Sequence, residues 1–203
     1  MLLPKLYQVE DPVEIERFLR EHSFATVFSE LEAAHVPLLY DSKAKILTGH
    51  LTTGNPVLKG MASSGRVLAI FQGPHGYISS SSYIDQTIPP TWNFTAAHVL
   101  GRARILSSNE DKLRILQATV SHYEAQNGTN WSFDSEDREI LSMLPLITGF
   151  EIEIESVQCC YKLSQNRTPE DFKSAVEQLE KKSDGSYREL AHWMRTRAGK
   201  TKR

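Results

Sequence analysis

Two polar stretches of the sequence carry the side-chain types that bind anions. Residues 49–56 (Gly-His-Leu-Thr-Thr-Gly-Asn-Pro) run from an expected strand into an expected helical turn, so hydroxyls, an amide and free backbone N–H groups collect there. Residues 162–167 (Lys-Leu-Ser-Gln-Asn-Arg) close another expected strand just before a helix, with a cation at each end. Either stretch suits a phosphate group. For the second, a polar loop ahead of a capped helix explains the composition equally well.

Motifs that would indicate a metal or a catalytic centre are missing from the sequence. Four histidines, His35, His50, His75 and His98, fall on or beside expected strands, but none has a second ligand at a zinc-site spacing. They suit the lining of a polar pocket better than a metal site. The glycine-rich residues 72–78 are expected to form a tight turn, because they lack the Gly-Lys-Ser/Thr of a phosphate-binding loop. There is no Gly-x-Ser-x-Gly sequence, and no catalytic residue is assigned.

The elements that must position these residues are mainly strands. Strands are expected at residues 24–29, 34–40, 45–51, 67–72, 93–105, 147–155 and 158–163. The clearest is 147–155, where the apolar Phe150, Ile152 and Ile154 alternate with glutamates, so one face should be wet. The adjacent Cys159 and Cys160 should point to opposite faces of a strand, which argues against a zinc or redox pair. The pattern predicts a mainly β protein with α-helices (α+β), built as a barrel-like antiparallel sheet.

Helices are indicated by their capping residues. Asp11-Pro12, Ser108 and Thr168-Pro169 each stand at an expected helix start, and another helix is expected near residues 135–144. In the helix after Ser108 the expected buried residues are Leu113, Leu116, Val120 and Tyr123. In the last helix they are Tyr187, Leu190, Ala191 and Met194. The expected organisation is a domain of residues 1–167 and a helical C-terminal arm of residues 168–203, packed on that domain or serving as a dimer arm.

Composition and charge exclude several classes of protein. The chain has 203 residues with 23 Lys+Arg against 25 Asp+Glu, a net charge of -2, so a global basic footprint for nucleic acid is absent. No signal peptide is visible, and no apolar run reaches the ~18 residues of a membrane-spanning helix. A cytoplasmic protein with no membrane partner is therefore expected, and unpaired cysteines agree with a reducing compartment.

The basic residues are concentrated at the C-terminal end. Residues 193–203 contain five basic residues and no acidic one. The last two helices superficially resemble a helix-turn-helix, so weak DNA binding is one expectation. The side chains that could contact nucleic acid are Arg188, His192, Arg195, Arg197 and Lys200, followed by Lys202 and Arg203 at the chain end. The alternative is a packing or dimer arm, because the apolar face of the last helix needs a partner surface.

Several segments taken together resemble one family. They are residues 34–39, 49–56, 67–78, 90–94 with His98 and Gly101, 149–152 and 162–167. From about Met1 to Leu179 the chain resembles the PaiB family of FMN-binding negative transcriptional regulators. The resemblance implies an FMN-binding split β-barrel, related to pyridoxamine-phosphate oxidase, in a homodimer with flavin sites at the subunit interface. The family name implies repression of sporulation and of degradative-enzyme (protease) production in spore-forming bacteria.

The resemblance also implies which residues bind FMN. The phosphate should lie near Thr52, Thr53 and Asn55. The flavin ring should lie near His35, Gln72, Trp92 and Asn93, with Lys162, Gln165 and Arg167 reaching from the partner chain. His50 belongs to the same expected site.

The sequence departs from the family pattern in places. Residues 78–83 read Ile-Ser-Ser-Ser-Ser-Tyr where the family usually has Ile-Ser-Pro-Ser-Trp-Tyr. Thr53 stands where a basic residue is expected before Asn55-Pro56. Losing a stacking aromatic and a phosphate-binding cation predicts weaker FMN retention with an unchanged fold.

Three functional interpretations follow from the resemblance. The first is an FMN-binding regulator that acts on DNA directly or through another protein. The second is a flavin-dependent oxidoreductase with an indirect regulatory effect. The third is a stable dimer that has lost its cofactor.

Overall fold

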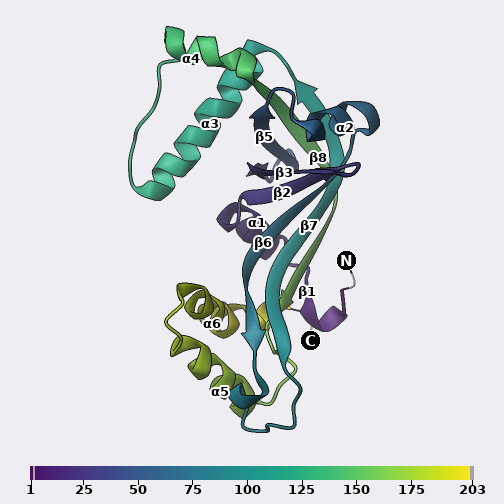
Figure 1. Ribbon diagram of the computed structural model, residues 1–203, viewed down its shortest axis with the longest axis vertical. Helices are drawn as coiled ribbons and strands as arrows, with labels where there is room; N and C mark the ends of the chain where they lie inside the picture. Colours follow the sequence, from purple (N-terminus) through teal and green to yellow (C-terminus); the bar gives the residue numbers. More distant parts are fainter. Residues whose placement is uncertain (2, 202–203) are drawn as a thin grey trace. The chain divides into compact units, whose positions relative to one another are not determined.

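A computed structural model of the protein describes residue 1 and residues 3–201. Within this part of the chain, six α-helices accompany an eight-stranded antiparallel sheet (Figure 1). The strands are β1 (Gln8–Val9), β2 (Phe24–Ser29), β3 (Glu32–Pro37), β4 (Leu39–Asp41), β5 (Ile46–Thr52), β6 (Arg66–Ile78), β7 (Thr91–Leu106) and β8 (Ile147–Lys162). The helices are α1 (Pro12–Glu21), α2 (Pro56–Ser64), α3 (Asn109–Asn127), α4 (Arg138–Met143), α5 (Pro169–Glu180) and α6 (Gly185–Arg197). These elements confirm the expected α+β class.

The sheet has the strand order β3-β2-β6-β7-β8-β5-β4, and β1 pairs with β8. The ladder between β5 and β8 places Ile46 opposite Glu153 and Thr52 opposite Ile147. β3 and β5, which stand near the two ends of the strand order, also lie against each other. This contact gives the sheet the barrel-like closure that the sequence predicts.

The chain divides into two compact units. The first comprises residues 1–19, 72–98 and 158–203, and the second comprises residues 20–71 and 99–157. The expected C-terminal arm, residues 168–203, falls within the first unit. Its service as a packing or dimer arm stays a prediction, and Lys202 and Arg203 lie outside the described residues.

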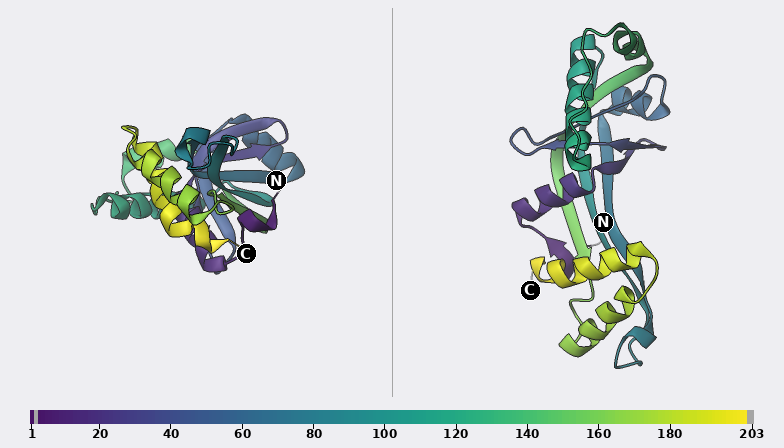
Figure 2. Two further views of the ribbon diagram at one scale, coloured as in Figure 1. Left: turned by 90° about the horizontal axis from the view of Figure 1, so that it is seen from below. Right: turned by 90° about the vertical axis from the view of Figure 1, so that its left-hand side faces the viewer.

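The core of the first unit forms around α6. This helix buries Leu190, Ala191, Trp193 and Met194, and it lies beside α5 (Figure 2). The Trp193 ring meets Phe18 and Tyr161 edge-on, at centroid distances of 5.7 and 5.4 Å. The Tyr161 hydroxyl donates to the buried Glu14 carboxylate over 3.1 Å, and the same carboxylate pairs with Arg17. The apolar face of α6 therefore has its partner surface inside the same chain.

The second unit has a core of fully buried side chains from the strands and from the link between β3 and β4. Its largest members include Leu38, Leu47, Phe71, Phe150 and Ile152. The prediction that Phe150 and Ile152 point inward is therefore confirmed, whereas Ile154 is only half-buried.

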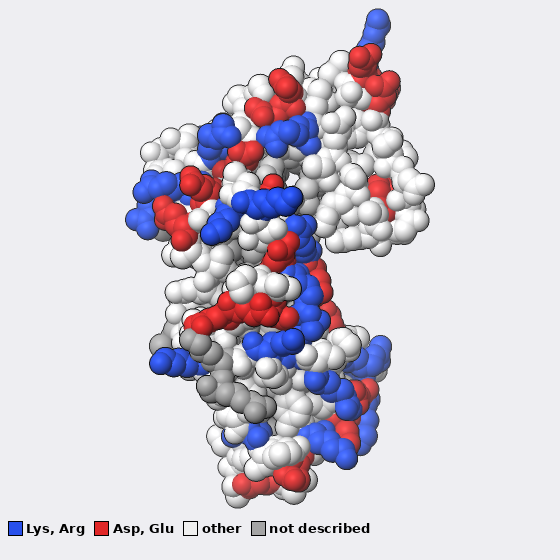
Figure 3. All heavy atoms as spheres, turned by 180° about the vertical axis from the view of Figure 1, so that it is seen from behind, with Lys and Arg blue, Asp and Glu red and all other residues white. Residues whose placement is uncertain are grey.

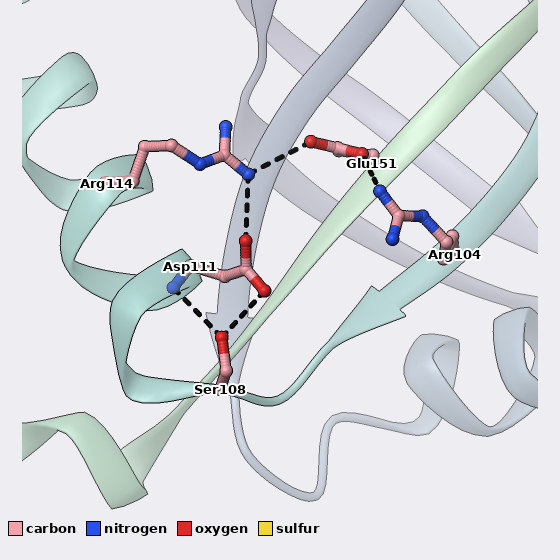
Figure 4. A network of polar contacts seen from close by, with 5 residues as sticks. All are labelled: Arg104, Ser108, Asp111, Arg114 and Glu151. Atoms are coloured by element: carbon pink, nitrogen blue, oxygen red, sulfur yellow. Dashed lines mark hydrogen bonds and ion pairs between the residues drawn. The ribbon is translucent and has the colours of Figure 1, made fainter.

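Of the three glutamates on the opposite face of β8, Glu153 and Glu155 are exposed and Glu151 is half-buried. Glu151 accepts a bond of 2.6 Å from Arg104 and one of 3.1 Å from Arg114, which also binds Asp111 (Figure 4). Two guanidinium groups thus cover the one glutamate that is not fully wet.

The expected turn at residues 72–78 is wrong, because these residues continue β6. Gln72, His75 and Tyr77 are exposed there, while the residues between them are buried. The glycine at 76 serves close packing: a Cβ on it would stand 3.0 Å from side-chain atoms of Tyr187 and Leu190. Glycines at these positions predict a turn, but the packing of α6 on the strand is what requires Gly76.

Two further expectations need correction. The strands expected at 147–155 and 158–163 are one strand, β8, because pairing with neighbouring strands outweighs the loss of alternation between them. In α3 the buried residues are Lys112 and Ile115, and the four expected ones are half-buried. Lys112 is buried because its ammonium donates to the Leu144 carbonyl over 3.0 Å while its stem packs inside.

Candidate functional site

The expected phosphate loop lies between β5 and α2, in the second unit. Asn55 caps α2: its Oδ1 accepts a bond of 3.0 Å from the Val57 N–H, and Pro56 takes the first helical position. Among the described residues, the Asn55 amide nitrogen and the exposed Thr52 hydroxyl have no hydrogen-bond partner. Both remain available to donate to an anion.

Thr53 is exposed but already bonded. Its hydroxyl donates to the Pro145 carbonyl over 3.0 Å and lies 3.1 Å from the Thr148 hydroxyl, and its N–H donates to the Leu146 carbonyl. Because a hydroxyl carries one hydrogen, Thr53 has no hydrogen left for a phosphate in this arrangement. Thr53 instead ties the loop to the start of β8.

His35 and His50, the two histidines of the second unit that are expected to bind FMN, lie in different environments. His50 is half-buried on β5, and burial lowers its pKa, so the ring is neutral at pH 7. His35 is exposed on β3, with Nδ1 2.9 Å from the Thr26 hydroxyl and its ring stacked on exposed Phe24 at 6.2 Å. Phe24 and His35 together form a flat exposed surface on β2 and β3.

A second aromatic surface lies in the first unit. Trp92, at the start of β7, is half exposed, and its ring lies 6.0 Å from His75 and 6.3 Å from Tyr77 on β6. Gln72 is exposed on the same strand. His75 and Tyr77 were not predicted as part of a site with Trp92. In the sequence, His75 and Tyr77 stand two positions apart with Gly76 between them, and this spacing is the signal that could have placed both side chains on one face of a strand.

Asn93 and Gln165 are bonded within the first unit. Asn93 is fully buried, and its amide nitrogen donates to the Ser164 hydroxyl over 2.9 Å. The Gln165 amide donates to the Tyr161 carbonyl over 2.6 Å and accepts from the Leu163 N–H over 2.7 Å. Both residues hold the end of β8 in place.

Lys162 and Arg167 are the cations of that segment. The Lys162 ammonium donates to the Thr91 hydroxyl (2.6 Å) and the Trp92 carbonyl (2.8 Å), leaving one hydrogen. Burial and the nearby Arg167 charge lower the Lys162 pKa. The Arg167 guanidinium lies 5.3 Å from the Tyr83 ring, and its buried Nε has no hydrogen-bond partner in the described part of the chain. An incoming acceptor could satisfy that nitrogen.

The residues expected to contact nucleic acid are largely bonded within the protein. Arg195 makes two bonds of 2.8 and 2.9 Å to Glu180, and Arg188 donates to the carbonyls of Lys182 and Ser183. Arg197 lies 3.7 Å from Glu14 and over the Trp193 ring. His192 and Lys200 are exposed. On the face drawn in Figure 3, acidic and basic side chains are interspersed.

The described residues give no indication of a metal site, a membrane-spanning helix or a reactive thiol. Within this part of the chain there is no group of three or more His, Cys, Asp or Glu that could hold a metal ion, and no helix is long and apolar enough to cross a bilayer. Cys159 and Cys160 lie on β8, as expected, and burial raises their pKa values to about 12 and about 11. Both thiols are protonated at neutral pH and are poor nucleophiles.

Comparison with known proteins shows which family this chain belongs to. The family model described as "Putative FMN-binding domain" matches residues 1–156. A Bacillus subtilis protein named "Protease synthase and sporulation protein PAI 2" is 36% identical over 203 residues, covering 96% of each chain. The chain belongs to the PaiB-type family of FMN-binding proteins. Its cofactor is accordingly FMN.

Solved structures agree on the split-barrel fold of this PaiB-type chain. The FAD and heme binding protein from Mycobacterium smegmatis matches with a TM-score of 0.57 at 14% identity, over 77% of this chain and 73% of that one. The flavocytochrome Anf3 from Azotobacter vinelandii matches with a TM-score of 0.56 at 13% identity, over 80% and 70%. At these identities the likeness concerns the fold alone.

Residues 49–56 of this PaiB-type chain offer neutral donors that would fit the phosphate of FMN. Thr52 and the Asn55 amide are free to donate, and no Lys or Arg lies within residues 49–56. The unpartnered Nε of Arg167 suits an anionic or carbonyl acceptor. FMN, when bound, supplies redox chemistry that the side chains lack. The chain's own contribution is to bind and orient it.

Proposed function

We propose that this protein is an FMN-binding negative transcriptional regulator of the PaiB type, which represses sporulation and degradative-enzyme (protease) production. The observation that carries the proposal is the 36% identity to the Bacillus subtilis protein over 96% of both chains. The name of that protein joins protease synthesis with sporulation. The family match over residues 1–156 adds the flavin.

The proposed FMN site uses the donors that the fold leaves unpaired. Thr52 and Asn55 bind the phosphate beside His50, while Thr53 positions their loop through Pro145. By resemblance to the family, His35, Gln72 and Trp92 are assigned to the flavin ring. In a homodimer, Lys162 and Arg167 reach the flavin of the partner chain. Asn93 and Gln165 act as positioning residues, because their amides are bonded to Ser164 and Tyr161.

Flavin binding is tested by the visible spectrum of the purified protein and by FMN titration. The expected result is bound-flavin absorbance. Arg167→Ala should weaken binding roughly tenfold or more, because a hydrogen bond to a charged acceptor contributes about 1.5–3 kcal/mol. Arg188→Ala, which removes an arginine that donates to the Lys182 and Ser183 carbonyls and is not assigned to the flavin, is the matched control. Unchanged FMN affinity in Arg167→Ala would remove Arg167 from the site.

Repression is tested separately from flavin binding. Deleting the gene from its host should raise protease production and sporulation, and restoring it should reverse both. Steady consumption of NAD(P)H by the FMN-loaded protein, with no change in protease production on deletion, would instead favour an oxidoreductase. The internal bonds of Arg188, Arg195 and Arg197 support repression that acts through another component rather than through base reading by α6.

A further inference from the structure

A pocket of about 500 Å³ is lined by residues from the C-terminal half of α3 and from the loop that leads to α4. Figure 1 shows this loop running back beside α3 toward α4. The pocket lies wholly within the second unit and contains none of the residues assigned to FMN. Its lining consists of Gln117, Val120, Ser121, Glu124, Ala125, Thr129, Asn130, Trp131, Ser132 and Phe133. A pocket of this volume holds a small metabolite, since ligand sites run from about 300 to 1,000 Å³.

Aromatic rings form one wall of the pocket. Trp131 and Phe133 have ring centroids 6.4 Å apart and planes inclined by 46°. Trp131 is 59% exposed, so a large apolar ring remains in water on a loop whose other residues are mostly polar. Val120 and Ala125 on α3 provide the apolar surface opposite the loop. The faces of such rings carry negative electrostatic potential and attract cations.

The charge around the pocket has one sign. Glu124 is the only charged residue of the lining, which includes no Lys, Arg or His. From residue 124 to residue 137 the sequence has four acidic residues, Glu124, Asp134, Glu136 and Asp137, and no basic one. The C-terminal end of α3, at Asn127, adds the partial negative charge of a helix end.

Glu124 is fixed at the pocket by the loop itself. Its carboxylate accepts from the Thr129 hydroxyl, and its backbone carbonyl accepts from the Thr129 N–H over 2.9 Å. Gly128, with φ of +72°, makes the reversal that brings the loop back along α3. A carboxylate, two aromatic faces and an apolar wall are therefore held around one space.

From this arrangement we propose that the pocket binds a small organic cation, an alkylammonium ion with a short apolar body. The ammonium group lies against Trp131 and Phe133 with Glu124 as its counter-ion, and the apolar body contacts Val120 and Ala125. The site is separate from the FMN site, so it does not depend on the proposed function.

Choline and 3,3-dimethylbutan-1-ol make a matched pair of probes, because a carbon replaces the charged nitrogen in an otherwise similar shape. Each is titrated into the full-length protein while the Trp indole N–H signals are followed by NMR, with and without saturating FMN. Choline should bind about 3- to 30-fold more tightly than the alcohol, the range expected for an ammonium on aromatic rings. FMN should not change this ratio.

Variants locate the binding. Trp131→Leu should lose most of the preference for choline, and Glu124→Gln should weaken choline binding several-fold while sparing the alcohol. Trp131 is exposed, so its replacement leaves the core intact. Glu110→Gln, an exposed acid at the opposite end of α3, is the control and should bind as the parent does. Equal binding of the two probes, no saturable choline binding, or an unchanged choline affinity in Trp131→Leu would overturn the proposal.

Discussion

The Thr53 side chain links the phosphate loop to the segment before β8 instead of offering a charge to the ligand. Its hydroxyl hydrogen is used by the Pro145 carbonyl, and Thr148 stands on its other side. The basic residue that the family pattern leads one to expect at this position would present a cation next to Thr52 and Asn55. If the FMN phosphate binds at this loop, as we propose, it meets fewer and weaker donors than a loop with a cation would offer.

Replacing Thr53 with arginine should strengthen FMN binding. A charge-assisted bond to phosphate contributes about 1.5–3 kcal/mol, so Thr53→Arg should lower the dissociation constant about tenfold or more, measured by quenching of FMN fluorescence. Thr53→Val is the control, because it removes the bond to Pro145 without adding a charge, and it should bind FMN no more tightly than the parent. If Thr53→Arg leaves the affinity unchanged, the phosphate does not lie at this loop.

Asp171 is a second residue whose role depends on its hydrogen bonds, because three groups donate to its carboxylate. It is buried, and its Oδ1 accepts from the N–H groups of Ile84 and Asp85 at 2.8 and 3.1 Å, while Thr168 donates to Oδ2. The bond from the Asp85 N–H, with help from the Thr168 hydroxyl, holds the Asp171 pKa below its ordinary value of 3.8. Its stabilising effect is therefore present above that ordinary value and is lost as the pH falls through the lower folded-state pKa.

Asp171→Asn should consequently lower the thermal unfolding midpoint at pH 7. The difference in unfolding midpoint between Asp171→Asn and the parent should narrow as the pH falls below 3.8. It narrows because the carboxylate of the parent becomes protonated as the pH passes through its lower folded-state pKa. Calorimetry at neutral and acidic pH measures both values. Asp11→Asn, at an exposed cap of α1, should leave the midpoint nearly unchanged at either pH. An unfolding midpoint that differs from the parent's by the same amount at all pH values would show that the Asp171 charge does not stabilise the segment containing Ile84 and Asp85.

At the scale of elements, strands that alternate and helices that begin at a cap were predictable from the sequence. Thr168 and Ser108 cap α5 and α3 as expected, and Phe150 and Ile152 face the core. The continuation of β6 through Gly76 was not predictable, because the close approach of Tyr187 and Leu190 involves residues more than 100 positions away. The same holds for the site: the family resemblance implies ligand contacts for Asn93 and Gln165, but their bonds to Ser164 and Tyr161 depend on the folded chain.

The close approach of β7 to β8 at Gly101 allows the arrangement of these neighbouring strands to be tested. A Cβ at Gly101 would stand 2.3 Å from the Glu153 carbonyl oxygen and 2.7 Å from the Ile152 side chain. Because the nearest atom is backbone, the strand itself must shift, and Gly101→Ala should cost about 1–3 kcal/mol in the free energy of unfolding. Urea denaturation measures the cost. Gly199→Ala, where no heavy atom lies within 4 Å of an added Cβ, should change stability little. Equal stabilities for the two variants would contradict the β7–β8 packing.

At the scale of the whole molecule, the net negative charge and the internal ion pairs of α6 disfavour tight binding to DNA. The net charge is -2, and the basic side chains of α6 are mostly paired, Arg195 with Glu180 and Arg197 with Glu14. To contact phosphates, these arginines must first give up internal partners. Deleting α6 would also uncover the core that Leu190 and Trp193 help to fill, so substitution rather than truncation is the suitable test.

We therefore expect direct DNA binding to be weak and independent of sequence. The dissociation constant should be on the order of 10⁻⁴–10⁻⁶ M at physiological salt, with a log–log salt slope near -0.9 for each phosphate neutralised. Fluorescence anisotropy of a promoter duplex and a scrambled duplex over a salt series measures both quantities. Arg188→Gln, Arg195→Gln and Lys200→Gln combined should flatten the slope, whereas Lys43→Gln, on an exposed turn, should not. Tight binding that favours the promoter and survives the triple substitution would place the DNA-reading surface elsewhere than α6, because sequence discrimination requires contacts to base edges or to DNA shape as well as to phosphates.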